Sequence, residues 1–221
     1  MKKLLILSVV FLSVFIIYLS TLDRKVYVMI LSTAKDASYN TNVKKLLQNK
    51  NILEKYVDEF SVEDYRVTDY VKAIKDNISI EKEGKKLTIK NSLIKADLII
   101  LDLVKNDLFN KIMYEENDEV LHNYVESIAS DLDELLKLIR IYSKEDIYIL
   151  EVYNPGNIYP KHIIKYMNDK IKSLAKYYKI KYIETNIEKS MIKDIIKLNE
   201  KGEKRVFEQM KEELNKSLFN K

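Results

Sequence analysis

The stretch that decides the fold is Ala96 to Asn110, which reads ADLIILDLVKNDLFN. Its uninterrupted apolar run, Leu98 to Leu101, predicts a strand buried on both faces, as the central strands of parallel sheets are. The chain then continues into Asn106 and Asp107. Because open α/β sheets bind their ligands at the carboxyl ends of the strands, we expect an α/β fold with a site at this point.

Further strand and helix patterns alternate on both sides of this stretch. Strands are predicted at Lys25 to Leu31, Tyr56 to Phe60, Ile147 to Val152 and Lys179 to Glu184. Helical spacing predicts helices at Asn42 to Leu53, from the capping pattern Ser61-Val-Glu-Asp64 onward, and at Asn91 to Lys95, Glu119 to Tyr142, Ile163 to Tyr178 and Asn199 to Phe219. Between two of these helices, Ile78 to Ile80 and Leu87 to Ile89 predict a surface hairpin. Alternating strands and helices predict a parallel sheet covered on both faces.

The composition indicates one domain with a solvated surface. Of the 221 residues, 47% are hydrophobic and 33% are charged, and the net charge is only +4. Lysine and glutamate are interspersed along the chain, which favours a solvated surface over a nucleic-acid-binding face. The absence of cysteine excludes disulfides, thiol nucleophiles and thiolate metal sites.

The amino-terminal segment, residues 1–23, predicts a membrane anchor ahead of a domain at residues 24–221. Lys2 and Lys3 precede the uncharged run Leu4 to Leu22, whose helix would span about 28 Å, close to a bilayer core. The lysines predict that the amino end stays in the cytoplasm and the domain lies outside the cell membrane. Since no small-x-small cleavage site follows, we expect an uncleaved single-pass signal anchor, with secretion after cleavage as the alternative.

Polar motifs follow the predicted strands in a recognisable order. The loops read STAKD at 32–36, VEDYRVTD at 62–69, LVKND at 103–107, YNP at 153–155 and DIIKLNEKG at 194–202. In order and spacing these segments resemble the SGNH/GDSL family of esterases and lipases. Its blocks are a Gly-Asp-Ser turn, a glycine after the second strand, Gly-x-Asn-Asp, an Asn-Pro turn, and Asp-x-x-His before the last helix. The resemblance covers Lys25 to Leu218. It implies a flavodoxin-like three-layer α/β/α sandwich and hydrolysis of acyl esters of lipids or acetylated sugars.

The resemblance also implies a nucleophile position that this chain does not fill with serine. Ala34 stands at the family's catalytic serine, with Ser32 at its glycine and Thr33 at its aspartate. A register shifted by one residue places Thr33 at the serine instead. In either register the expected serine is missing, and Ser32 would lie near the substrate.

The oxyanion and substrate positions are better matched. Asn106 corresponds to the family's oxyanion asparagine. A role as helix N-cap for Asp107 onward is the plainer interpretation, and the two roles can coexist. Asp107 follows it as in the family motif, while Val104 replaces the motif's glycine. Asp64 falls nearest to the glycine of the second block, and Asn154 lies in the Asn-Pro turn.

The base position is also substituted. Asp194 matches the aspartate of Asp-x-x-His, but Lys197 stands where the histidine belongs. A protonated lysine cannot accept a proton, so a salt bridge between Asp194 and Lys197 is the plainer interpretation. The two histidines of the chain, His122 and His162, are the remaining candidates for a base.

Three hypotheses follow from these substitutions. The first is a membrane-anchored, extracytoplasmic SGNH-like protein with impaired catalysis, which binds an acyl ester, a glycan or a protein partner. The second is a slow esterase with Thr33 or Ser32 as nucleophile and Lys197 or water as base. The third is a structural or interaction domain whose cleft is filled. The sequence predicts no cofactor and no metal, because it holds no glycine-rich phosphate loop and no metal-ligand cluster.

Overall fold

The computed structural model describes residues 25–34, 36–82, 84–156, 160–193 and 197–219. The predicted anchor lies outside these residues. Within them, no helix is both long and apolar enough to cross a bilayer.

Strands and helices alternate along the described chain. Their order is β1 (Val26–Ser32), α2 (Ser38–Asn49), β2 (Leu53–Val57), α3 (Val67–Asp76), β3 (Ser79–Lys82), β4 (Lys85–Thr88), α4 (Ile89–Lys95), β5 (Leu98–Asp102), α5 (Lys105–Ile112), α6 (Asp118–Tyr142), β6 (Asp146–Leu150), α7 (Lys161–Tyr177), β7 (Lys181–Ile183), the 3₁₀ turn η1 (Lys189–Met191), α8 (Glu200–Leu214) and the π-helical turn η2 (Asn215–Phe219).

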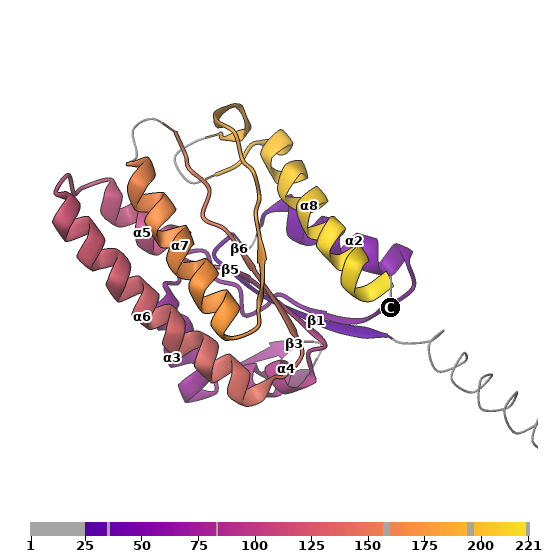
Figure 1. Ribbon diagram of the computed structural model, residues 1–221. Coiled ribbons are helices and arrows are strands. Elements are labelled where there is room, and N and C mark those ends of the chain that lie inside the picture. The colour runs from indigo at the N-terminus through magenta and orange to yellow at the C-terminus, as the bar shows by residue number, and fades with distance from the viewer. Residues whose placement is uncertain (1–24, 35, 83, 157–159, 194–196, 220–221) are drawn as a thin grey trace, which may run out of the picture.

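Five strands form one parallel sheet in the order β2-β1-β5-β6-β7 (Figure 1). This is a flavodoxin-like, doubly wound order, in which the direction of winding reverses between β1 and β5. Ser32 at the end of β1 pairs with Asp102 at the end of β5. The two strands therefore end side by side at what we call the carboxyl edge of the sheet; the opposite end is the amino edge.

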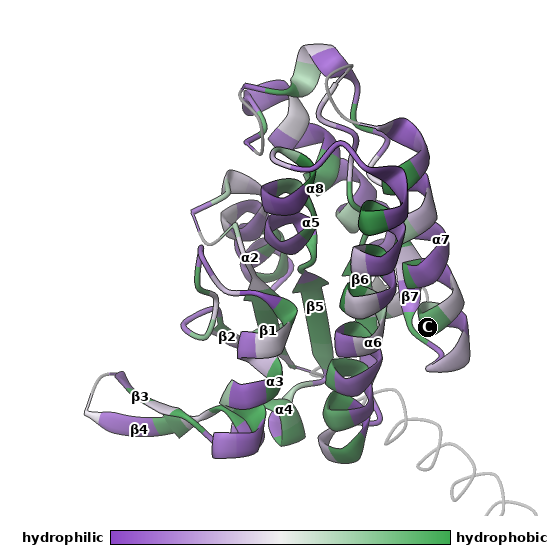
Figure 2. Ribbon diagram, turned by 90° about the vertical axis from the view of Figure 1, so that its left-hand side faces the viewer, coloured by the Kyte–Doolittle hydropathy of each residue, from purple (hydrophilic) through white to green (hydrophobic). Residues whose placement is uncertain are grey.

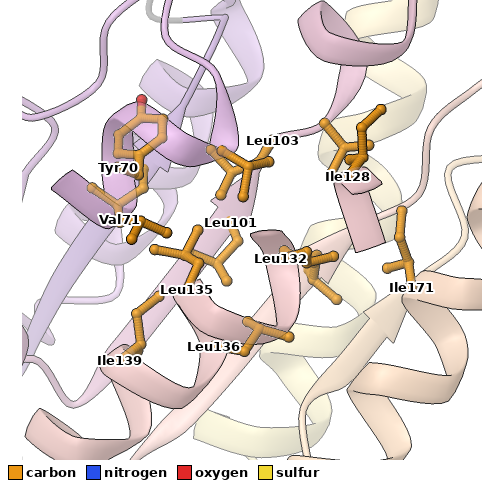
Figure 3. Close-up of a cluster of buried hydrophobic side chains, with 14 of the residues drawn as sticks. Tyr70, Val71, Leu101, Leu103, Ile128, Leu132, Leu135, Leu136, Ile139 and Ile171 are labelled. Atoms are coloured by element: carbon orange, nitrogen blue, oxygen red, sulfur yellow. The ribbon is translucent and has the colours of Figure 1, made fainter. Parts of the chain in front are cut away.

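The central strands alternate their side chains between two cores, as the apolar runs predict. On β1, Met29 and Leu31 belong to a large core under α3, α4, α5, α6 and α7. Val28 and Ile30 belong to a smaller core under α2 and α8. Figure 3 shows part of the large core, where Leu101 lies among leucines of α6. Helices thus cover both faces of the sheet, which confirms the predicted three-layer arrangement.

Most elements lie within a few residues of their predicted positions. The strand predicted at Tyr56 to Phe60 is found earlier, at β2, because pairing with β1 begins at Leu53. The closing helix does not run unbroken to Phe219, since α8 ends at Leu214 and a π-helical turn follows. These shifts reflect tertiary pairing, which a local pattern does not contain.

The helix predicted from Ser61 is the clearest correction. The structure begins α3 at Val67, where the Asp69 carboxylate accepts the Arg66 N–H at 2.8 Å. Ser61 instead bridges to β1. Its hydroxyl donates to the Ile30 carbonyl at 3.1 Å and accepts a hydrogen bond from the Ser32 N–H at 3.1 Å. A serine that looks like a helix cap is used here to hold a loop to the sheet.

The predicted hairpin is confirmed. β3 and β4 pair antiparallel and form a separate two-stranded sheet. In Figure 2 the hairpin extends away from the body of the domain beside α3 and α4. It therefore lies far from the carboxyl edge, where the arrowhead of β5 points.

Candidate functional site

A pocket of about 500 Å³ opens at the carboxyl edge of the sheet. We call it the main pocket. Its walls come from the turn after β1, the loop after β2, the start of α5 and the connection into α8. The lining residues are Thr33, Ala34, Asp36, Ala37, Glu63, Asp64, Arg66, Lys105, Asn106, Asn110, Lys197 and Glu203. Apart from the two alanines, all of them are polar or charged. The pocket lies beside the switch point of the sheet, where this class of fold binds ligands.

The main pocket brings together predicted site residues from four separate segments. These are Thr33, Ala34, Asp64, Asn106 and Lys197. Three other predicted residues do not line it. Ser32 and Asp107 are buried beneath the surface, and Asn154 lines a second pocket of about 320 Å³ beside α7. Asp194, and with it the predicted ion pair to Lys197, lies outside the described residues.

Ser32 is fully inaccessible because its hydroxyl is part of the sheet edge. Its Oγ donates to the Asp102 carboxylate at 3.0 Å and accepts the Ala34 N–H at 2.9 Å. A hydroxyl held in this way shapes the turn after β1. It cannot reach an ester bound in the main pocket, so the structure contradicts the use of Ser32 as a nucleophile or as a substrate contact.

Thr33 lines the main pocket, but its polar groups turn back toward β5. Its N–H and its hydroxyl both donate to the Asp102 carbonyl, at 3.0 Å and 3.4 Å. None of the residues that line the pocket is a histidine. The imidazoles of His122 and His162 instead stack on each other between α6 and α7, with ring centroids 6.0 Å apart. The arrangement leaves the Thr33 hydroxyl without an imidazole base.

A buried polar cluster that the sequence analysis did not identify lies under the main pocket. Lys105 Nζ lies 2.7 Å and 2.9 Å from the two carboxylate oxygens of Asp102. The same carboxylate accepts hydrogen bonds from Ser32 and from Tyr39. Burial, together with the adjacent Asp102 charge, raises the pKa of Tyr39 well above its ordinary value, so the phenol stays a donor. The cluster joins β1, α2, β5 and α5 at one point.

One sequence signal could have revealed this cluster. Asp102 closes the apolar run of the deciding stretch, and Lys105 follows three residues later. A carboxylate at the end of a buried strand needs a partner, and a cation three positions on can supply one. Nothing local, however, indicates that Ser32 and Tyr39 complete the set.

Val104 holds a backbone conformation that favours glycine. Its φ is 74° and its ψ is −33°, and its side chain is buried in the large core. A β-branched residue at positive φ is strained, typically by about 1–3 kcal/mol. In the resemblance described above this position belongs to a glycine. The backbone at Val104 thus adopts a conformation that glycine adopts more readily.

Asn106 is not the helix cap that one interpretation predicts. Helix α5 begins at Lys105, so Asn106 lies inside its first turn. Its side-chain amide donates to the Glu63 carbonyl and so ties α5 to the loop after β2. Asn106 keeps its place in the pocket wall, but one of its amide hydrogens is already engaged.

Lys197 reaches the same loop from the opposite side. Its Nζ lies 3.3 Å from the Glu63 carboxylate, and its side chain is 59% exposed. An ammonium group offers three donors and no lone pair, so in this state it cannot accept a proton from a nucleophile. The position that resembles a catalytic histidine is occupied here by a surface cation.

Asp107 is buried behind the pocket wall. Its carboxylate accepts the Val67 N–H at 3.2 Å, which holds the start of α3 against α5. Burial raises its pKa to about 6, although the hydrogen bond and the nearby Arg66 oppose the shift. Among the described residues, no group of three histidine or carboxylate side chains could hold a metal ion.

Comparison with known proteins identifies the fold. No protein-family model and no curated protein matches the sequence. Solved structures do match. The chain is similar to the acetyl xylan esterase AlAXEase, with TM-score 0.64 and 13% identity over 85% of this chain and 98% of that one. It is similar to the family 3 carbohydrate esterase of Clostridium thermocellum, with TM-score 0.62 and 14% identity over 89% and 98%. It is also similar to a lipolytic G-D-S-L family protein of Veillonella parvula, with TM-score 0.56 and 11% identity over 84% and 96%.

The strain at Val104 can be measured by comparing two substitutions. Val104→Ala and Val104→Gly both remove the buried side chain, but only glycine relieves the positive φ. We expect the glycine variant to have the higher free energy of unfolding, by about 1 kcal/mol, whereas glycine is normally the less stable of the two. Urea denaturation of both variants measures the difference. An alanine variant as stable as the glycine variant, or more so, would contradict the strain.

The buried Asp107 predicts a pH dependence of stability. Its folded pKa lies above the unfolded value, so between about pH 4 and pH 6 the folded state binds more protons than the unfolded state. Stability therefore falls as pH rises through this window. Asp107→Asn is expected to remove about 2–3 kcal/mol of this dependence. Urea denaturation at several pH values measures it, with Asp36→Asn at an exposed position as the control.

Proposed function

We propose that this chain, which has an SGNH/GDSL hydrolase-like fold, is a ligand-binding domain whose hydrolytic chemistry is lost or strongly impaired. One observation carries the proposal. The main pocket is open at the place where this fold binds ligands, yet Ala34 and Lys197 stand at the positions that resemble the catalytic serine and histidine. The pocket is present and the chemistry is absent.

Ester hydrolysis of this kind needs a nucleophile beside a base, and donors for the oxyanion. Ala34 carries no nucleophile. The Ser32 and Thr33 hydroxyls donate to the side chain and the backbone of Asp102. Lys197 is paired with Glu63 and exposed to water. The remaining oxyanion donor, Asn106, stabilises charge only if an attack takes place.

The two alternatives are less well supported. A slow esterase would need Thr33 to leave the Asp102 carbonyl and find a base. A structural domain with a filled cleft conflicts with a pocket of about 500 Å³. Among the ligand classes that the sequence leaves open, the polar lining favours a glycan over an acyl chain, since hydroxyl groups can pair with its amides, carboxylates and cations.

The location is part of the same proposal. The apolar run Leu4 to Leu22 anchors the chain in the cell membrane, and the lysines before it keep the amino end in the cytoplasm. The domain then faces the extracytoplasmic side, where cell-envelope glycans are available as ligands.

Hydrolysis of short-chain p-nitrophenyl esters tests the loss of chemistry. The wild-type chain is expected to match the buffer rate, and Thr33→Ala is expected to change nothing. The double variant Ala34→Ser with Lys197→His returns the two missing groups to the frame, so a rate above buffer is expected. Wild-type turnover that disappears in Thr33→Ala would overturn the proposal in favour of a slow esterase.

Titration calorimetry with acetylated and deacetylated xylo-oligosaccharides as probes tests ligand binding. Asn110 lies in the pocket wall with its side chain exposed. Loss of a neutral hydrogen bond in Asn110→Ala is expected to weaken binding about five-fold. Asn49→Ala, at an exposed position at the end of α2 on the amino edge, is the matched control and should bind as the wild type does. Equal weakening in both variants, or no binding of either probe, would count against a glycan ligand in the main pocket.

A further inference from the structure

Each strand of the parallel sheet is preceded at the amino edge by an exposed lysine. In chain order these are Lys25, Lys50, Lys95, Lys144 and Lys179, before β1, β2, β5, β6 and β7. We call this set the basic edge. Parallel strands begin at the same end of a sheet, so residues that are far apart in sequence form one surface. The regular position, one lysine before every strand, is a property of the fold that the sequence alone does not display.

Large apolar side chains accompany these lysines. Ile94, Ile141 and Tyr177 lie in the last turns of α4, α6 and α7, and their exposed fractions are 60%, 65% and 76%. Each lies within three residues of a lysine of the basic edge. Exposed apolar side chains interspersed with lysine are typical of surfaces that contact a lipid interface.

Two acidic side chains at the amino edge are engaged within the domain, whereas Glu145, next to Lys144, is exposed. The Asp97 carboxylate accepts the Tyr27 N–H at 2.8 Å, and Asp146 lies 3.3 Å from Lys181. In the part of the chain that the structure describes, no ion pair engages Lys25, Lys95, Lys144 or Lys179. These four lysines are exposed to solvent.

Arg140 adds a further cation to this surface. Its guanidinium donates to three carbonyls of the connections before β6 and β7, those of Glu145, Tyr178 and Lys179, at 2.8–3.0 Å. These bonds hold the two connections together. The lysines of both connections are thereby fixed on one surface rather than free to move apart.

The carboxyl edge carries mixed charge. Four carboxylates, those of Asp36, Glu63, Asp64 and Glu203, line the main pocket together with the cations Arg66, Lys105 and Lys197. Asp118 and Glu119 add two more at the start of α6. The lysine before each strand gives the amino edge a positive patch, which favours the approach of this end to an anionic surface.

We propose that the basic edge, with Ile94, Ile141 and Tyr177, rests on the surface of an anionic membrane. The occupant is the headgroup layer of the lipid bilayer itself. The chain approaches this end of the domain from its amino terminus, since only Asp23 and Arg24 separate the apolar run Leu4 to Leu22 from Lys25. Three residues of chain span about 10 Å at most, so the predicted anchor would hold the basic edge within reach of the headgroups.

This orientation sets the position of the main pocket. β1 has seven residues, so the carboxyl edge lies about 23 Å beyond the amino edge. The main pocket then faces away from the bilayer, toward material at some distance from the membrane. The inference rests on the proposed anchor for its geometry, but not on the ligand or on the loss of hydrolysis.

The absence of cysteine allows a direct test on the full chain. Ile141→Cys places one fluorophore at the amino edge, and Glu116→Cys places one at the carboxyl edge as the matched control. The chain is reconstituted in vesicles of phosphatidylcholine, with or without phosphatidylglycerol, that carry a headgroup nitroxide quencher. With phosphatidylglycerol we expect the Ile141→Cys label to be quenched at least about three-fold more than the Glu116→Cys label.

Charge reversal then tests whether the lysines of the basic edge cause the difference in quenching. Each lysine near an anionic leaflet contributes about five-fold to the association, so Lys95→Glu, Lys144→Glu and Lys179→Glu together, or high salt, should abolish the difference between the labels. The same reversal at Lys189, Lys193 and Lys201, exposed lysines on the carboxyl-edge side, should leave it intact.

Two failures remain distinguishable in this experiment. Release of the chain from the vesicles by alkaline carbonate would show that the anchor is wrong. If the chain stays anchored but its two labels are quenched equally, the basic edge does not contact the membrane. A protein partner then becomes the occupant to test. Neither result depends on the esterase or glycan assays, so the function of the main pocket is judged separately.

Discussion

The buried carboxylate of Asp102 is the constraint on which the carboxyl edge depends. A buried charge is costly unless it is paired and fully hydrogen-bonded. Here Lys105 neutralises it, while Ser32 and Tyr39 donate to its Oδ2. These donors come from three elements and the carboxylate from a fourth, so one side chain fixes the turn after β1 against α2, β5 and α5. The floor of the main pocket is therefore a structural cluster.

This use of Asp102 agrees with the proposed loss of hydrolysis. The hydroxyls that lie nearest to the nucleophile position now stabilise the sheet edge through hydrogen bonds to Asp102. Val104 has a glycine-like φ of 74°. The packing of its side chain in the large core and the start of helix α5 directly after it hold the backbone in this strained conformation. In the proposed binding role, the backbone of this edge supplies the pocket, while the Ser32 and Thr33 hydroxyls are engaged with Asp102. A binding role needs only the frame and the pocket.

The two ends of the parallel sheet carry different surfaces. Helix-to-strand connections gather at the amino edge and supply lysines, while strand-to-helix connections gather at the carboxyl edge and supply the polar pocket. Because every strand runs in the same direction, a charge placed at one kind of connection always reaches the same end of the molecule. A modest net charge of +4 therefore does not exclude a local basic surface.

The sequence by itself determined the alternation of strands and helices, the buried strand at Leu98 to Leu101, the hairpin and the segments that meet at the pocket. These are periodic or local signals, and periodicity is preserved on folding. Only the tertiary structure decided that Ser61 braces β1, that Ser32 and Asp107 are buried and that Asn154 belongs to another pocket. The same holds for the partners of Asp102 and Lys197. Those outcomes depend on which distant side chains compete for one donor or acceptor, and that competition exists only after the strands have paired.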